Sequence, residues 1–438
     1  MSIEQKYENT YKSMNRVIKQ RREARRYTAL GLTSNLDLLC DFHIQKLNAL
    51  LEQHHPELDG NQIEAHRQIH SLKEMLETIV FFCMKGIGGE VEFEDIHYMK
   101  EAFQWTLGMG GTGVQAALAL DMLNSPSVVH LTDNSKEVCE ILDRDSIFCV
   151  SQNGKLISTM EVEQDAPQEI HCIVQFQKGD KIHVGSTEIV IPESNRLIFT
   201  KMTVNTRVPF YEPYFHYIEK EAKHFSSIVI SSFNEIEDER LFDEKIKYLQ
   251  KHIHAYKANN AKGIVFFEDA HYHTYAIKEQ CMKQLYSFMD IVSLNEEELI
   301  YTLQKCGIQK NVNRIIECIE GVQCLREKFC IQKGMIVHTK DYAMYVGDAL
   351  DVDIEAGLIY GNLLATTKAI CGWYGTYKQI GETMKLQLSA YGMQQRDIIR
   401  RSVYKENVIL VPSKYIDKPK YTIGLGDSFV AGVQMCFE

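Results

Sequence analysis

The chain has 438 residues, of which 45% are hydrophobic and 24% charged, and its formal net charge at pH 7 is −11. This length and composition are typical of a folded protein with one large domain and an appendage, or with two domains. No apolar stretch approaches the ~20 residues that a membrane-spanning helix needs, and the negative charge argues against a general nucleic-acid-binding surface. We therefore expect neither a membrane nor a nucleic acid as a partner.

The first residues include a basic run, KQRREARR (19–26), with no apolar core of a secretory signal before it. We interpret the run as a solvated basic helix rather than a nucleic-acid patch. The 12 cysteines show no CxxC spacing, which is typical of reduced thiols. These features predict a cytoplasmic protein.

The first expected strand spans residues 27–37, YTALGLTSNLD, and ends in Asn35 and Asp37. An amide and a carboxylate at the end of a strand can each bind paired sugar hydroxyls. The same two residues suit an Asx-turn or a helix cap, because DLLCDF can start a helix. Taken alone, this motif leaves both interpretations open.

Two segments depart from the strand–helix alternation of the rest of the chain. Residues 38–107 are mostly helical, and residues 148–204 alternate as antiparallel strands do, with QNGK and KGDK as hairpin turns. We predict that 38–107 and 148–204 form a smaller α+β lid domain. The larger α/β domain then comprises residues 1–37, 108–147 and 205–438.

The segment LGMGGTGVQAALAL has glycines spaced as in a dinucleotide-binding fingerprint, at Gly108, Gly110 and Gly113, and the next strand ends in Asp133. The preceding EAFQWT is a poor parallel strand, which weakens that interpretation. We favour a site where Gly110 and Gly111 let a neutral polyol approach the backbone. Glycines that serve only helix–strand packing are the other alternative.

Short β-branched runs separated by amphipathic helices continue through the rest of the chain. This alternation predicts a mainly parallel sheet covered by helices on both faces, with ligands at the carboxyl ends of the strands. The further expected strands are 127–135, 227–235, 263–269, 290–298, 335–341 and 408–414. The polar residues at the strand ends predict a site built from Asn35, Asp37, Asn234, Glu268, Asn295, Glu298, His338 and Thr339.

The segments FFED and NEEE place Glu268 and Glu298 at neighbouring strand ends, with Asn295 beside them. Carboxylates from separate strands suit Mg²⁺, which keeps most of its waters and accepts one or two such ligands. NEEE equally fits an N-capped helix with acids in its first turn. The pair His271 and His273 has no third ligand nearby, so we expect no metal there.

Residues 421–432, YTIGLGDSFVAG, combine two glycines with the start of a helix. Glycines let the backbone approach a ligand, and a helix N-terminus favours an anion. The N–H groups of Gly424, Leu425 and Gly426 can then stabilise a transferring phosphoryl group, while Asp427 takes the proton of the acceptor hydroxyl. The alternative is a turn in which the aspartate only caps the helix.

This ordered set of motifs resembles the ADP-dependent glucokinase and phosphofructokinase family of the ribokinase-like superfamily. The resemblance runs from about residue 27 onward, and NEEEL, VHT and VPSKYIDKPKYTIGLGD are its most specific stretches. It implies a ribokinase-like α/β fold with a lid domain. It also implies an Mg²⁺-dependent kinase whose ligands are ADP and a hexose or a hexose phosphate.

The resemblance assigns roles to individual positions. The catalytic residues would be Asp427 as the base, with Gly424 and Gly426 as the anion hole. The Mg²⁺ site would involve Glu268, Asn295 and Glu298. The sugar-binding residues would be Asn35, Asp37, Glu90, Gly110 and Gly111. The nucleotide-binding residues would be Arg196, His338, Thr339 and Gly424.

One position departs from the family pattern. Glu268 matches the glutamate of the family's HxE motif, but the first residue of the motif is Phe266 instead of histidine. This departure removes an expected hydrogen-bond partner of the metal site, not the carboxylate itself.

The charge of the residues in the lid bears on which sugar is the acceptor. The family's glucokinases use a lid glutamate, matched by Glu90, whereas its phosphofructokinases need a cation for the sugar phosphate. The available cations are Lys178, Arg196, Lys201 and Arg207. Because a glutamate in a shared pocket would repel the sugar phosphate, we predict transfer from ADP to the 6-hydroxyl of glucose. The alternatives are a 6-phosphofructokinase, an ATP-dependent ribokinase-like kinase, an NAD-linked oxidoreductase and a non-catalytic sugar- or nucleotide-binding protein.

Overall fold

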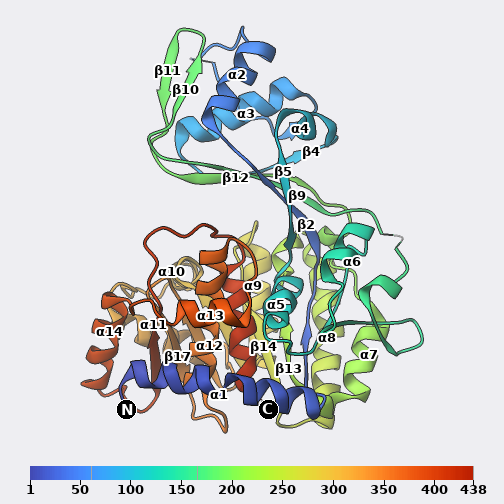
Figure 1. The fold of residues 1–438 in the computed structure, drawn as a ribbon. Helices are drawn as coiled ribbons and strands as arrows, with labels where there is room; N and C mark the ends of the chain where they lie inside the picture. The colour runs from blue at the N-terminus through green and yellow to red at the C-terminus, as the bar shows by residue number, and fades with distance from the viewer. Residues whose placement is uncertain (61, 165, 438) are drawn as a thin grey trace. The chain divides into compact units, whose positions relative to one another are not determined.

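The computed structural model describes residues 1–60, 62–164 and 166–437, which form two compact units (Figure 1). The large unit comprises Met1–Ser34, Gly111–Asp165 and Asn205–Glu438. The small unit comprises Asn35–Gly110 and Ala166–Val204. Each unit is built around its own main sheet, so the chain has two bodies formed from interleaved segments.

The boundary between the units falls earlier in the chain than predicted, because residues 27–37 form two strands and not one. β1 (Tyr27–Leu30) lies in the large sheet, and β2 (Asn35–Cys40) lies in the sheet of the small unit. β2 pairs antiparallel along its whole length with β5 (Trp105–Gly110). Residues 35–37 and 108–110 therefore belong to the small unit.

A second boundary falls later than predicted. Residues 148–164 lie in the large unit and not in the lid, because β7 (Ile147–Val150) pairs in parallel with β6 (Ser127–Val129) of the large sheet. The QNGK segment then joins β7 to β8 (Leu156–Ile157) as a hairpin, as predicted.

The large unit contains a ten-stranded, mainly parallel sheet, which confirms the predicted α/β class. Every pairing from β16 through to β7 is parallel, and only β16–β17, β17–β18 and β7–β8 are antiparallel. In sheet order the strands are β18 (Val408–Pro412), β17 (Tyr342–Gly347), β16 (Gly334–His338), β15 (Ile291–Asn295), β14 (Ile264–Glu268), β13 (Phe225–Ile230), β1, β6, β7 and β8. β17 was not predicted, because a three-residue connection joins it directly to β16.

Helices pack on the large sheet in two groups (Figure 1). The first group is α1 (Ile3–Glu23), α5 (Thr112–Asp121), α12 (Ile354–Cys371) and α15 (Leu425–Val433). The second is α7 (Glu212–Lys220), α8 (Glu239–Asn259), α9 (Tyr275–Gln284), α10 (Glu296–Lys305) and α11 (Ile315–Lys328). The remaining helices of this unit are α6 (Lys136–Leu142), α13 (Tyr377–Thr383) and α14 (Ala390–Arg400). Within the part of the chain that the structure describes, no helix is long and apolar enough to cross a bilayer.

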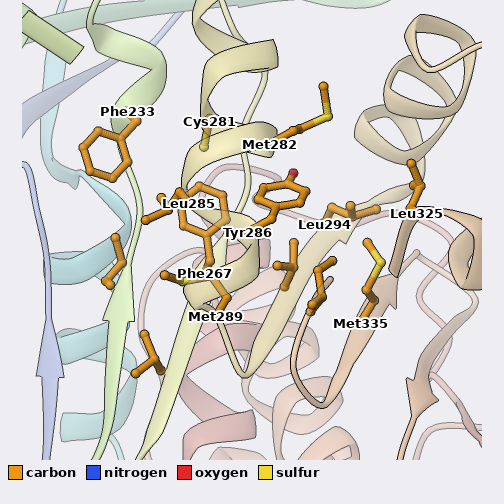
Figure 2. Close-up of a cluster of buried hydrophobic side chains, with 14 of the residues drawn as sticks. Phe233, Phe267, Cys281, Met282, Leu285, Tyr286, Met289, Leu294, Leu325 and Met335 are labelled. Atoms are coloured by element: carbon orange, nitrogen blue, oxygen red, sulfur yellow. The ribbon is translucent and has the colours of Figure 1, made fainter. Parts of the chain in front are cut away.

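Side chains alternate between the two faces of each strand, and one face contributes to a large apolar core (Figure 2). In β14, Phe267 packs in this core with Tyr286 and with Cys281 of α9. Phe266, its neighbour along the strand, is fully buried but faces the other way. Glu268 therefore shares the face of Phe266, at the last position of the strand.

The small unit is built on a six-stranded sheet in the order β3-β4-β12-β9-β2-β5. Its further strands are β3 (Gln68–Ile69), β4 (Gly89–Phe93), β12 (Asn195–Lys201) and β9 (Ile170–Phe176), and its helices are α2 (Ile44–His54), α3 (Leu72–Lys85) and α4 (His97–Ala102). One face carries the apolar residues of these strands, such as Leu38, Val174 and Phe199, which form a core with the helices. The opposite face carries most of the polar residues.

The predicted hairpin at KGDK is wrong. β9 does not pair with the strand that follows it; instead β10 (Lys181–Val184) pairs with β11 (Thr187–Val190) in a separate hairpin. Gly185, in the left-handed region at φ 55°, lies in the turn of that hairpin. β9 pairs instead with β2 and β12, and the apolar residues that alternate along it pack in the core of the small unit.

One arginine of the basic run is not solvated. Arg21, on α1, is 2% exposed and donates to the carbonyl oxygens of Gln434 and Phe437. It also donates to the hydroxyls of Thr28 and Ser226. Arg21 therefore ties the first helix to the sheet and to the end of the last helical segment.

His130, which follows β6, is a buried neutral histidine. Its Nδ1 lies 2.7 Å from the carbonyl oxygen of Leu32, and its Nε2 accepts the backbone N–H of Tyr211 at 2.9 Å. Nδ1 must therefore carry the proton. Burial lowers the pKa of His130 from its ordinary value of 6.5 to about 4.

This shift predicts how stability depends on pH. Between about pH 6.5 and pH 4 the unfolded chain binds a proton at His130 that the folded chain does not, so falling pH favours unfolding over that window. The full loss is about 3 kcal/mol of unfolding free energy. Chemical denaturation across the window should show that slope, and His130→Asn, which does not titrate, should flatten it. His183→Asn, at an exposed position, is the control. An unchanged slope in His130→Asn would contradict the assignment.

Candidate active site

Three of the predicted site residues end adjacent parallel strands of the large sheet. Glu268 ends β14, Asn295 ends β15 and His338 ends β16. In the strand register, Asn295 lies opposite His338, and Glu268 lies opposite Ser293. The structure thus gathers the predicted acid, amide and imidazole at one edge.

His338 contacts the acid directly. Its Nε2 lies 3.0 Å from Oε1 of Glu268, and its ring lies 4.9 Å from the ring of Phe429 on α15. Glu268 is 6% exposed. Phe266, at the position where the resemblance implies a histidine, cannot hydrogen-bond to this carboxylate. The hydrogen-bond partner that the sequence lacks at Phe266 is instead supplied from β16.

A buried ionic cluster that the sequence did not reveal follows Glu268. Asp269 is paired with Lys278 of α9, and both side chains are almost fully buried. Oδ2 of Asp269 also accepts the hydroxyl of Tyr286 at 2.7 Å. Nothing in the local sequence marks Lys278, because it lies in an ordinary amphipathic helix.

The NEEE segment forms an N-cap, as one of the two interpretations predicted. Oδ1 of Asn295 accepts the N–H of Glu298 at 2.9 Å, and Oε2 of Glu298 accepts the N–H of Asn295 at 2.8 Å. This reciprocal capping box explains the N-x-x-E spacing locally. The capping box engages Oε2 of Glu298, and Oε1 takes no part in it.

The acids at this edge fit a divalent cation. Oε2 of Glu268 is buried and has no hydrogen-bond partner among the described residues. Burial, together with the carboxylates of Asp269 and Glu268, raises the pKa of Glu298 well above its usual range. A cation would relieve this repulsion. Among the described residues there is no cluster of three or more metal-binding side chains, at His271 and His273 or elsewhere, so a cation here would take most of its ligands from water.

The GLGD loop begins α15. Gly424 is the N-cap residue, in the left-handed region at φ 64°, and Asp427 lies in the first turn. The N–H groups of the first helical residues, Leu425 and Gly426 among them, have no acceptor within the helix. They and the helix dipole make this turn suitable for an anion.

This loop lies beside the acids of the strand ends. A methyl group built on Gly426 would lie 3.3 Å from Cε1 of His338 and 4.0 Å from Oε1 of Glu268. The predicted anion hole and the predicted metal ligand are therefore neighbours in the large unit.

A pocket of about 480 Å³ opens next to the loop. Its lining includes Asn295, His338, Thr339, Lys414, Gly426 and Phe429. The hydroxyl of Thr339 is already engaged in the turn to β17, where it accepts the N–H groups of Asp341 and Tyr342. Asn234, also predicted here, instead donates to Glu235 in the turn after β13.

The polar face of the small unit carries the predicted sugar-binding pair. Asn35 and Asp37 are both 3% exposed, and Nδ2 of Asn35 donates to Oδ1 of Asp37 at 2.9 Å. Nδ1 of His171, on β9, lies 3.2 Å from Nδ2 of Asn35. Gly110 makes room for the pair, since a methyl group there would lie 2.2 Å from Nδ2 of Asn35.

Glu90 and Arg196 lie on the same face of this sheet. Glu90 on β4 lies opposite Ile198 on β12. Arg196 lies two residues before Ile198 on β12, so its side chain is on the same face as that of Ile198. The guanidinium of Arg196 makes no hydrogen bond or ion pair among the described residues. The other predicted cations differ: Lys178 pairs with Glu193, and Lys201 donates to the carbonyl of Glu94. Arg207 lies in the large unit.

The dinucleotide interpretation of the glycine motif does not fit the structure. The strand before it, β5, runs antiparallel to β2 and belongs to the small unit, so no parallel strand–helix–strand unit is formed. Gly111, at φ 93°, precedes α5, and a methyl group on it would lie 2.3 Å from the carbonyl oxygen of Thr33. Asp133 is fully buried and accepts the N–H of Ser135.

Comparison with known proteins agrees with the fold described above. Residues 26–434 match the family described as the ADP-specific Phosphofructokinase/Glucokinase conserved region. The ADP-dependent glucose/glucosamine kinase of Pyrococcus abyssi is 23% identical over 391 residues, which cover 83% of this chain and 84% of the relative. The ADP-specific phosphofructokinase of Pyrococcus furiosus is 21% identical over 457 residues, which cover 96% and 98%.

A solved structure of the last common ancestor of ADP-dependent phosphofructokinases from Methanosarcinales has the same fold. Its TM-score is 0.78 at 20% identity, and the match covers 99% of this chain and 98% of that one. The predicted fold is thereby confirmed across both units.

The packing around Gly424 yields a prediction. A methyl group there would lie 1.8 Å from Oε1 of Gln115 and 2.6 Å from Nζ of Lys368. Gly154 has nearly the same φ, 66°, but open space around it. Gly154→Ala should therefore lose only about 1–2 kcal/mol of unfolding free energy through backbone strain, and Gly424→Ala about 1–3 kcal/mol more through overpacking. Denaturant unfolding measures both, and equal losses would contradict the packing described.

Proposed function

The chain belongs to the ADP-specific phosphofructokinase/glucokinase family, and from this we propose that it transfers the terminal phosphoryl group of ADP to the 6-hydroxyl of glucose. One observation carries the proposal: the GLGD turn and the acids of the parallel strand ends lie side by side, next to a pocket of about 480 Å³. A phosphoryl transfer needs little else from a protein besides positioning and charge stabilisation.

In this proposal Asp427 is the general base. It takes the proton of the sugar hydroxyl as the new oxygen–phosphorus bond forms and the bond between the two phosphates of ADP breaks. AMP leaves, and the N–H groups at the start of α15 stabilise the charge on the transferred group. The pocket lined by His338 and Thr339 is assigned to the adenosine.

We assign Mg²⁺ to Glu268, with Asn295 and Glu298 ordering its waters. When bound, the ion supplies positive charge to the phosphates. The buried oxygen of Glu268 without a partner among the described residues supports this assignment. The contact from His338 holds the carboxylate at the end of the strand.

The sugar is assigned to the polar face of the small unit, where Asn35 and Asp37 form a hydrogen-bonded pair beside Gly110. Glu90 on this face favours a neutral hexose, because a carboxylate repels a sugar phosphate. A second candidate acceptor is fructose 6-phosphate, which the guanidinium of Arg196 on the same face favours.

A coupled assay crossing donors with acceptors tests the proposal. The donors are ADP, ATP and pyrophosphate, and the acceptors are glucose, fructose 6-phosphate and several nucleosides. We expect turnover with ADP and glucose that EDTA abolishes and added Mg²⁺ restores. Turnover only with ATP, or binding without product for every pair, would contradict it.

Replacement of the base gives a sharper prediction. Asp427→Asn and Asp427→Ala should lower kcat by about 10²–10⁴-fold, because a positioned base contributes that factor. Calorimetry should show that nucleotide and sugar still bind. Asp397→Asn, at an exposed position on α14, is the matched control. Unchanged turnover in both Asp427 variants would refute the assignment.

The two acceptors make opposite demands on the small unit. If the acceptor is glucose, Glu90→Gln should raise the KM for glucose about tenfold, as expected for the loss of one charged hydrogen bond. Arg196→Gln should then leave the KM for glucose unchanged. Contact between Arg196 and the nucleotide phosphates would instead raise the KM for ADP in this variant. Steady-state kinetics with each sugar separates these cases. A loss confined to fructose 6-phosphate in Arg196→Gln would favour the second candidate.

A further inference from the structure

A buried ammonium group lies directly behind the GLGD loop. Lys368, near the end of α12, is 1% exposed. Its Nζ donates to Oε1 of Gln115 at 2.6 Å, to the hydroxyl of Tyr374 at 3.2 Å and to the carbonyl oxygen of Gly424 at 3.2 Å. The ring of Tyr421 lies 5.5 Å away. Residues from α5, from α12, from the loop after α12 and from the segment before α15 thus surround one ammonium group.

The site is built to hold a charged lysine. An ammonium has three N–H donors and no acceptor, and three oxygens surround it. The ring of Tyr374 lies 4.3 Å from Nζ, close enough for a cation–π contact, and its hydroxyl also lies 3.1 Å from Oε1 of Gln115. An ammonium buried without such partners would be strongly disfavoured.

The contact with Gly424 adds to the hydrogen bonds that fix how the loop presents its N–H groups. The Gly424 carbonyl accepts Lys368 together with the N–H and the hydroxyl of Ser428, at 3.1 and 3.0 Å. In a trans peptide the C=O and the following N–H point in opposite directions. Holding this carbonyl toward Lys368 therefore aims the N–H of Leu425 away from Lys368.

The positive charge also acts through the peptide. An ammonium on the carbonyl side polarises the peptide unit and makes its N–H a stronger donor, since hydrogen bonds in series reinforce one another. Its field adds to that of the α15 N-terminus, and both favour negative charge in the first turn of the helix. Neither effect needs contact between Lys368 and a ligand.

We propose that Lys368 is a positioning residue that orients and polarises the GLGD loop toward a phosphoryl group, with Gln115 and Tyr374 fixing its ammonium. The proposal rests on the proposed function for its kinetic consequence. It connects the glycine-rich start of α5, which contains Gln115, to the anion-binding turn more than 300 residues later in the chain.

The sharpest test changes the charge and keeps the shape. Gln115→Glu retains an oxygen for Lys368 and adds a carboxylate, which the neighbouring ammonium keeps ionised. We expect kcat to fall at least tenfold and the thermal midpoint to stay equal or rise. A purely structural lysine would leave kcat unchanged in this variant, and a kcat within twofold of wild type would overturn the proposal.

Lys368→Met removes the charge itself, and we expect a kcat loss of about 100-fold. Lys257→Met is the matched control, because Lys257 also donates to a backbone carbonyl, that of Gly263, at the amino end of β14. The control should lose stability and keep its kcat. If Lys368→Met does not fold, Gln115→Glu decides.

A readout without catalysis separates this proposal from the proposed function. In the full chain labelled with ¹⁵N-glycine, inorganic phosphate should shift the amide resonances of Gly424 and Gly426 in the wild type. Gln115→Glu should weaken that titration at least tenfold. A wild type that shifts but phosphorylates no sugar would refute the proposed function only. Equal titrations in wild type and variant would refute the role of Lys368.

Discussion

A parallel strand that is covered by helices on both faces can present polar side chains to a ligand only at its ends. This constraint governs the large unit, where Phe266 and Phe267 of β14 are both buried and the first polar side chain of the strand is Glu268 at its end. β15 and β16 end in the same way, in Asn295 and His338. Because all three strands run in one direction, their polar ends meet at one edge of the sheet.

The same constraint explains why the fold and part of the site could be predicted from the sequence. Strand ends are local features, so Glu268, Asn295 and the GLGD turn stand out in a single reading of the chain. Contacts between distant segments leave no such mark. Lys368 lies 253 residues from Gln115, and each looks like an ordinary helical residue in its own surroundings. The partner of Glu268 was missed for the same reason, since His338 is 70 residues away.

Several motifs admit a structural and a functional interpretation at once, and the structure shows that the two are compatible. The reciprocal cap of Asn295 and Glu298 starts α10, yet it also holds both side chains at the sheet edge. In the small unit, the bond between Asn35 and Asp37 fixes two side chains that would otherwise rotate. Local stabilisation and site geometry thus come from the same hydrogen bonds, which is why spacing alone could not decide between them.

Arg21 has a consequence for how the polypeptide is assembled as it emerges from the ribosome. Its guanidinium binds the carbonyl oxygen of Phe437, which is synthesised 416 residues later. At a translation rate of about 5–20 residues per second, that partner appears roughly 20–80 s after the arginine. During this interval the nascent large unit cannot complete its packing, whereas the last residue of the small unit, Val204, is made well before Phe437. Vectorial synthesis therefore favours a small unit that matures first and a large unit that closes only after the segment around Phe437 has been made.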